Sequence, residues 1–134
     1  MGLFTKKTKI KPVVETQGLR IEFDSEYEIW QFNDGGINFV VYGPVCEAPS
    51  RDQLGEIRSD INRLRPEMAQ KVAHGLKDYE GVKTNDGETF VVNITDLQSQ
   101  GTFDVCWSGG ESWGDMGVDF TIKNHEIKEE SWGD

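Results

Sequence analysis

The apolar side chains of this chain change their spacing twice, and the change limits the folds that the chain can adopt. Between residues 50 and 80 they recur every three or four positions, which is the period of an amphipathic helix. On both sides of that segment they alternate with polar residues, which is the period of a half-buried strand. This order predicts the α+β class, with helices packed on one face of a mainly antiparallel sheet.

The helical segment carries its own start and break signals. Ser50 is a good N-cap, and Gln53 completes a capping box. Pro66 interrupts helical hydrogen bonding but suits the first turn of a new helix. We therefore predict a helix pair at about residues 50–80, broken or kinked near Pro66. The two apolar stripes are Leu54, Ile57, Ile61 and Leu64, then Met68, Val72, Leu76 and Tyr79.

Strand patterns flank the helical segment on both sides. Strong turn signals stand at Asn33-Asp34-Gly35-Gly36 and at Asn124-His125. One face of the sheet is expected to pack on the helices, and the opposite face to be acidic and solvated. The predicted strands are 19–24, 27–32, 37–42, 89–94, 102–107, 117–122 and 126–131.

A chain of 134 residues is most often one domain. Residues 1–18 hold four lysines against Glu15 and lack a long apolar pattern, so they predict a basic N-terminal arm. Residues 19–134 then form a single α+β domain. The start MGLFTKKTKIKP lacks the apolar segment of a signal peptide. Together with the absence of a membrane-spanning stretch, this start favours a cytoplasmic protein.

The net charge is −10, and the acidity is concentrated in the last third of the chain. Residues 84–134 contain Lys123 and Lys128 against eleven acidic residues. Such a balance argues against nucleic acid as a partner, because phosphate binding needs a basic surface. Two interpretations stay open, a solvated face that serves solubility and a surface for a basic partner.

The residues that usually carry catalysis are present but scattered. His74 and His125 lie far apart in the sequence, and so do Cys46 and Cys106. Neither pair has a metal-ligand spacing, and the chain lacks the nucleophile, zinc and phosphate-loop motifs. Glu111, Asp115 and Asp119 do not follow the spacing of a calcium loop. We therefore predict no enzyme activity, no cofactor and no metal.

A five-residue word occurs twice near the end of the chain. Glu111-Ser112-Trp113-Gly114-Asp115 recurs as Glu130-Ser131-Trp132-Gly133-Asp134. The predicted hairpin between the copies brings them together, so Trp113 and Trp132 are expected to stack. One interpretation is a tryptophan clasp that closes the end of the sheet. The other is an aromatic patch, ringed by carboxylates, that binds a basic partner. The predicted contact residues are Glu111, Trp113, Asp115, Asp119, Glu129, Glu130, Trp132 and Asp134.

The last third also resembles a known group of proteins. The likeness rests on residues 103–107, on residues 111–120 and on the closing residues 126–134. It is to small uncharacterised bacterial proteins of toxin–immunity gene clusters. The resemblance implies a binding role and transfers no catalytic residue. Immunity proteins against nucleases are often acidic, because they cover a site that is built for phosphate.

These observations lead to one functional prediction and one alternative. The prediction is a non-catalytic immunity protein that neutralises a basic toxin domain by steric and electrostatic occlusion. The alternative is a small-ligand or peptide-binding module with a Trp-rich acidic surface. That surface would use Trp30, Trp107, Trp113 and Trp132.

Overall fold

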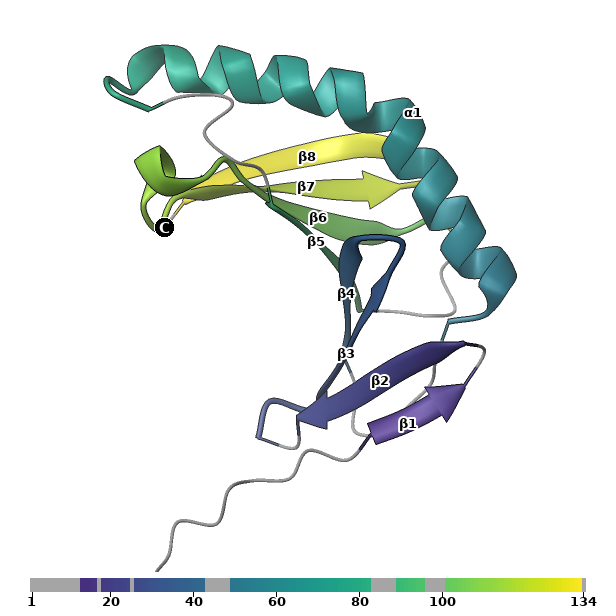
Figure 1. The fold of residues 1–134 in the computed structure, drawn as a ribbon. Coiled ribbons are helices and arrows are strands. Elements are labelled where there is room, and N and C mark those ends of the chain that lie inside the picture. Colours follow the sequence, from purple (N-terminus) through teal and green to yellow (C-terminus); the bar gives the residue numbers. More distant parts are fainter. Residues whose placement is uncertain are drawn as a thin grey trace, which may run out of the picture.

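The computed structural model describes residues 13–16, 18–24, 26–42, 49–82, 89–95 and 101–133. These residues form a single sheet of eight strands, β1 to β8 in chain order, and one long helix, α1, that packs against it (Figure 1). The helix α1 spans Arg51–Gly75 and continues as a 3-10 turn, Leu76–Asp78. The strands are β1 Val13–Thr16, β2 Leu19–Asp24, β3 Ile29–Asp34, β4 Ile37–Tyr42, β5 Thr89–Ile94, β6 Phe103–Ser108, β7 Gly117–Lys123 and β8 Glu126–Gly133.

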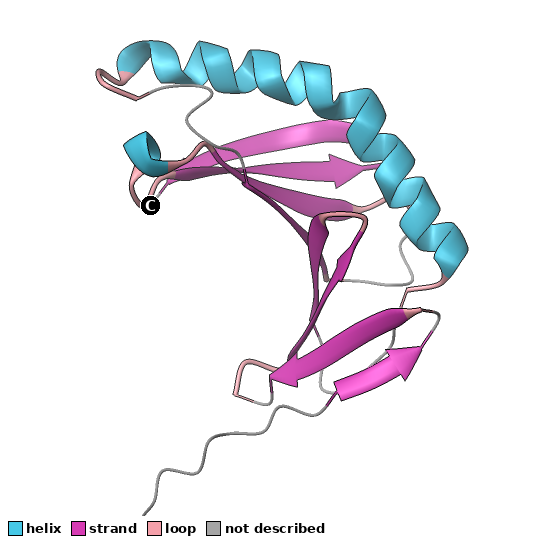
Figure 2. Cartoon of the chain, viewed as in Figure 1, coloured by secondary structure: helices cyan, strands magenta, loops and turns pink. Residues whose placement is uncertain are grey.

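Neighbouring strands of the sheet pair antiparallel, except that β4 and β5 run parallel. The parallel pair follows from the position of α1, because a strand–helix–strand crossover returns the chain in the same direction. The sheet curves around the helix, and α1 lies along its concave face (Figure 2). We call the face away from α1 the outer face.

The predicted helix pair is wrong, because α1 continues through Pro66 without a break. An interior proline costs about 3 kcal/mol relative to alanine. Proline has no N–H, so the carbonyl of Asn62, four residues earlier, lacks its helical hydrogen-bond donor. Both residues are exposed, so water can bond to that carbonyl instead. The apolar residues before and after Pro66 pack on the same sheet face, and their burial outweighs the cost. The broader prediction of an α+β fold with a mainly antiparallel sheet is confirmed.

The helix is attached to the sheet by its apolar stripe and, near its N-terminus, by an ion-pair cluster. Leu54, Ile57, Ile61, Leu64, Met68, Val72 and Leu76 are buried, as their spacing predicts. At the N-terminus of α1, the amide of Gln53 donates to Ser50 Oγ at 3.1 Å. Asp34, at the end of β3, accepts from Arg51 at 3.1 Å and from Arg58 at 2.6 Å. These contacts fix the first half of α1 over the β3–β4 turn.

The N-terminal region differs from the sequence prediction in one respect. Residues 1–12 lie outside the described residues, but Val13–Thr16 form the edge strand β1. The predicted arm of residues 1–18 therefore extends too far. The segment Val13-Val14-Glu15-Thr16 does not alternate, so its strand is set by pairing with β2 and not by a local pattern.

Candidate functional site

The outer face of the sheet is the most extensive candidate surface. Within the ranges that the structure describes, no element packs over it. The pairing register places two rows of outward side chains across β3 to β8. One row is Gln31, Val40, Asn93, Asp104, Thr121 and Glu129. The other is Asn33, Asn38, Val91, Cys106, Asp119 and Ser131.

Carboxylates dominate the charge of these rows. Asp104, Asp119 and Glu129 lie on the neighbouring strands β6, β7 and β8. Two strand spacings, about 10 Å in total, separate β6 from β8. That distance is close to the Debye length at physiological salt, so their fields add. Glu22 on β2 extends the first row beyond Gln31, and Arg20 adds a cation on the same face of β2. The acidic part of the outer face is therefore strands β6 to β8, which attract cations.

The centre of the outer face is less polar than its periphery. Val40, Val91 and Cys106 are half-buried there, on β4, β5 and β6. An apolar centre with a charged periphery is the usual anatomy of a protein–protein interface. The arrangement suits contact with a protein better than with a small anion.

The structure divides the predicted contact residues among three places. Asp119 and Glu129 lie on the outer face. Glu111 and Asp115 are exposed in the loop around the 3-10 turn Glu111–Trp113. Glu130, Trp113 and Trp132 are engaged on the α1 side of the molecule, and Asp134 lies outside the described residues.

The expected stacking of Trp113 and Trp132 is confirmed. Their ring centroids lie 5.8 Å apart, with 21° between the planes. Trp113 is buried, and half-buried Trp132 also stacks on Tyr79 at 6.2 Å. A Cβ on Gly109 would lie 2.1 Å from the Trp113 ring, and one on Gly75 would lie 2.3 Å from the Trp132 ring. The pair joins the loop before β7, strand β8 and the end of α1.

Glu130 belongs to the same internal assembly. Trp132 Nε1 donates to Glu130 Oε2 at 2.9 Å, and Lys71 Nζ lies 3.8 Å from Glu130 Oε1. Adjacent strand residues point to opposite faces, so Glu129 faces outward while Glu130 faces α1. Glu130 thus helps to hold β8 against the helix.

Sequence reasoning missed a polar contact between α1 and the β7–β8 turn. His125 Nδ1 lies 2.8 Å from Asp60 Oδ2, and Arg63 lies 3.3 Å from the other oxygen of Asp60. Arg63 also donates to the His125 carbonyl. Asp60 is buried, and the available signal was a carboxylate next to Ile61 in the apolar stripe. This cluster fixes the turn to the helix.

The chemistry available on the outer face does not favour catalysis. Burial raises the pKa of the Cys106 thiol to about 11, and a hydrogen bond with Asp119 and its charge add to the effect. The thiol therefore stays protonated at neutral pH and is a poor nucleophile. His74 is exposed on α1. In the described part of the chain, no three His, Cys, Asp or Glu side chains are grouped to hold a metal ion.

The tryptophans of the alternative interpretation lie mostly inside the protein. Trp30, Trp107 and Trp113 are buried, and Trp132 is half-buried.

Among the described helices, none combines the length and apolar character that a membrane crossing requires. No family model matches the chain, and neither curated proteins nor solved structures gave a significant match. The fold and the outer face thus define an α+β domain with an acidic sheet surface.

Proposed function

We propose that the protein is a non-catalytic binding domain that captures a basic protein on its outer face. In this proposal it acts as an immunity protein, which covers the functional surface of a toxin domain. The observation that supports the proposal is the outer face itself. Asp104, Asp119 and Glu129 lie on β6, β7 and β8, beside a half-buried centre that contains Val91 and Cys106. Glu111 and Asp115 are proposed as further contacts at the end of the sheet.

Charge decides which kind of partner this surface suits. A second copy of the chain would bring the same carboxylates against each other, and each copy carries a net charge of −10. Like charges across an interface cost several kcal/mol and suppress such pairing. A basic partner gains attraction and is steered toward the face during encounter. The free thiol of Cys106 suits a reducing compartment, and we propose the cytoplasm.

Capture from a lysate of the source cells, with matched variants, tests the proposal. The test variant carries Asp104→Lys, Asp119→Lys and Glu129→Lys on the outer face. The control carries Glu56→Lys, Glu67→Lys and Glu80→Lys at exposed positions on α1 and just after it. The two variants have the same net charge and differ only in where the charge is reversed.

The proposal predicts a basic protein that is retained by the parent and by the control and lost by the test variant. The purified partner should also lose its own activity when the parent protein is added. Equal retention of that protein by both variants would remove the outer face from the proposed function.

A further inference from the structure

Strand β8 is the last strand of the sheet, and no strand of the described residues pairs with it beyond β7 (Figure 1). Alternate residues of an edge strand turn their N–H and C=O groups away from the sheet, where an added strand can bond to them. β8 runs over eight residues, Glu126–Gly133, whereas β1 at the opposite edge has four. The edge of β8 is therefore the longer of the two places where the described sheet can grow.

The outer side of this edge is acidic. Glu129 faces outward on β8, and Asp119 faces outward on the neighbouring strand β7. Both side chains are exposed. The lysines of this hairpin, Lys123 and Lys128, stand closer to its turn, and Lys128 contacts Glu126 at 3.3 Å. An added strand would place a side chain about 5 Å from Glu129, so its outward positions favour cations.

The inner side of the same edge is aromatic, and its one carboxylate is already engaged. Glu130 accepts from Trp132 Nε1 at 2.9 Å and lies 3.8 Å from Lys71 Nζ. Trp132 is half-buried, and Tyr79, which stacks on it, is 44% exposed. A side chain that neighbours Trp132 on an added strand would cover these rings. The inward positions of an added strand therefore favour apolar residues.

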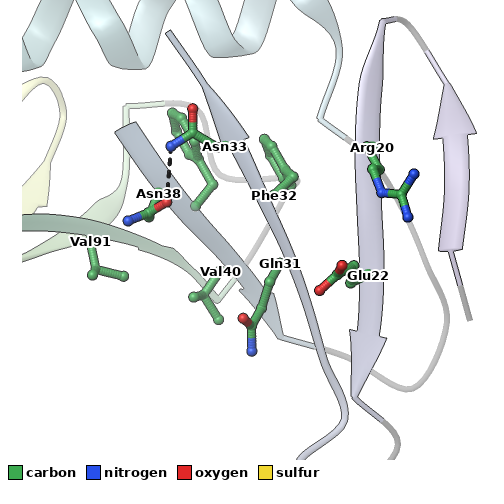
Figure 3. A pocket seen from close by; sticks show the side chains of 9 residues that line it. Arg20, Glu22, Gln31, Phe32, Asn33, Asn38, Val40 and Val91 are labelled. Atoms are coloured by element: carbon green, nitrogen blue, oxygen red, sulfur yellow. Dashed lines mark hydrogen bonds between the residues drawn. The ribbon is translucent and has the colours of Figure 1, made fainter. Parts of the chain in front are cut away.

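A hollow of about 450 Å³ between β2 and β5 offers no such choice of charge. Arg20 and Glu22 both line it, and their charges are opposite (Figure 3). The edge of β8 differs in this respect, because its outer and inner sides favour different side chains.

We propose that β8 pairs with an extended segment of the basic partner in which cationic and apolar side chains alternate. The cationic side chains face outward beside Glu129, and the apolar ones cover Trp132 and Tyr79. Backbone hydrogen bonds supply affinity in such strand addition, and alternate side chains supply specificity. The β8 strand of a second copy carries three glutamates and one lysine, so it suits this edge less than a basic strand. This inference rests on the proposed function and names the element of the partner that is recognised.

Peptide titrations followed by NMR and amide hydrogen exchange test this assignment on the intact protein. The probe is a seven-residue peptide of alternating lysine and valine, with both ends blocked. The control peptide has the same composition, with its lysines and valines in two separate blocks. Glu129→Lys is the test variant, and Glu56→Lys on α1 is a control with the same charge change at an exposed position.

We expect the alternating peptide to slow amide exchange within residues 129–133 by about tenfold at about ten times its Kd. Exchange within β1 should stay unchanged, and the control peptide should bind more weakly. Glu129→Lys should weaken the alternating peptide about fivefold, which corresponds to the loss of one cross-strand ion pair. Glu56→Lys should have little effect.

Equal binding of the two peptides, equal effects of the two variants, or unchanged exchange at residues 129–133 in millimolar peptide would overturn the assignment. Protection of these residues that grows with protein concentration, without peptide, would overturn it in favour of a second copy. A captured partner that is inhibited but leaves exchange at residues 129–133 unchanged would overturn strand addition and leave the proposed function intact. Peptide binding as expected, with no basic protein captured from the lysate, would count against the proposed function alone.

Discussion

Trp113 and Trp132 tie three parts of the chain that are distant in sequence. Their stacking needs the absence of side chains at Gly75 and Gly109, where a Cβ would enter the rings. The repeated five-residue word therefore has a structural role, since both of its tryptophans lie in one contact. Its carboxylates diverge in role, because Glu130 faces the helix and Glu111 faces solvent.

Truncation of the two rings should have unequal effects on stability. Trp113→Ala removes a buried ring and should lower the free energy of unfolding by about 3 to 5 kcal/mol. Trp132→Ala removes a half-buried ring and should lower it less. Urea unfolding curves of both variants check the order. A Trp132→Ala variant less stable than Trp113→Ala would show that the contact is organised differently.

The Cys106 thiol should resist alkylation in the folded protein. Its pKa is raised from 9.0 to about 11, chiefly by burial, and only the thiolate reacts. The two-unit rise lowers the thiolate fraction at pH 8 by about a hundredfold. Iodoacetamide labelling of a Cys46→Ala variant, folded and then in denaturant, measures the ratio. A folded rate equal to the unfolded rate would contradict the packing of Cys106 against Asp119.

The stability of helix α1 depends both on the low helix propensity of Pro66 and on the packing of the helix against the sheet. Pro66→Ala restores an interior hydrogen bond at an exposed position and should stabilise the protein by about 1 to 3 kcal/mol. The gain should stay below the full propensity difference, because α1 already packs along the curved sheet with Pro66 in place (Figure 2). Thermal unfolding measures the gain. A loss of stability would mean that α1 needs proline at this position to pack on the sheet.

The β7–β8 turn should loosen when its contact with α1 is removed. His125 has a positive φ of 66°, so His125→Asn removes the ring while keeping a residue that tolerates this conformation. Loss of the bond to buried Asp60 should cost about 1 to 3 kcal/mol. Hydrogen exchange should quicken at residues 123–127 more than elsewhere. His74→Asn on the exposed side of α1 serves as the control, and equal effects of the two would contradict the contact.

The sequence predicts elements well where a local pattern decides them. The buried stripe of α1, the Asn124-His125 turn and the stacking of Trp113 on Trp132 all follow from spacing. Pro66 misled the prediction because its local cost is visible in sequence, whereas the sheet packing that outweighs it is not. The β4–β5 parallel pair and the Asp60–His125 bond were missed because both depend on where α1 lies on the sheet.

At the scale of the whole molecule, the candidate site depends on register more than on composition. The sequence locates the acidity in the last third of the chain, but only strand pairing shows which carboxylates share a face. Asp104, which the sequence prediction omitted, joins Asp119 and Glu129 across β6, β7 and β8. The free edge of β8 likewise follows from strand order, for which its own sequence has no local signal.

The most direct test of the outer face is the salt dependence of association with the captured partner. Association rate constants of the parent should fall as salt rises, because screening shortens to about 8 Å at physiological ionic strength. The Asp104, Asp119 and Glu129 lysine variant should associate much more slowly at low salt and converge toward the parent at high salt. The α1 variant of equal charge should follow the parent more closely. Rates of the outer-face variant that match the parent at every salt concentration would contradict the account.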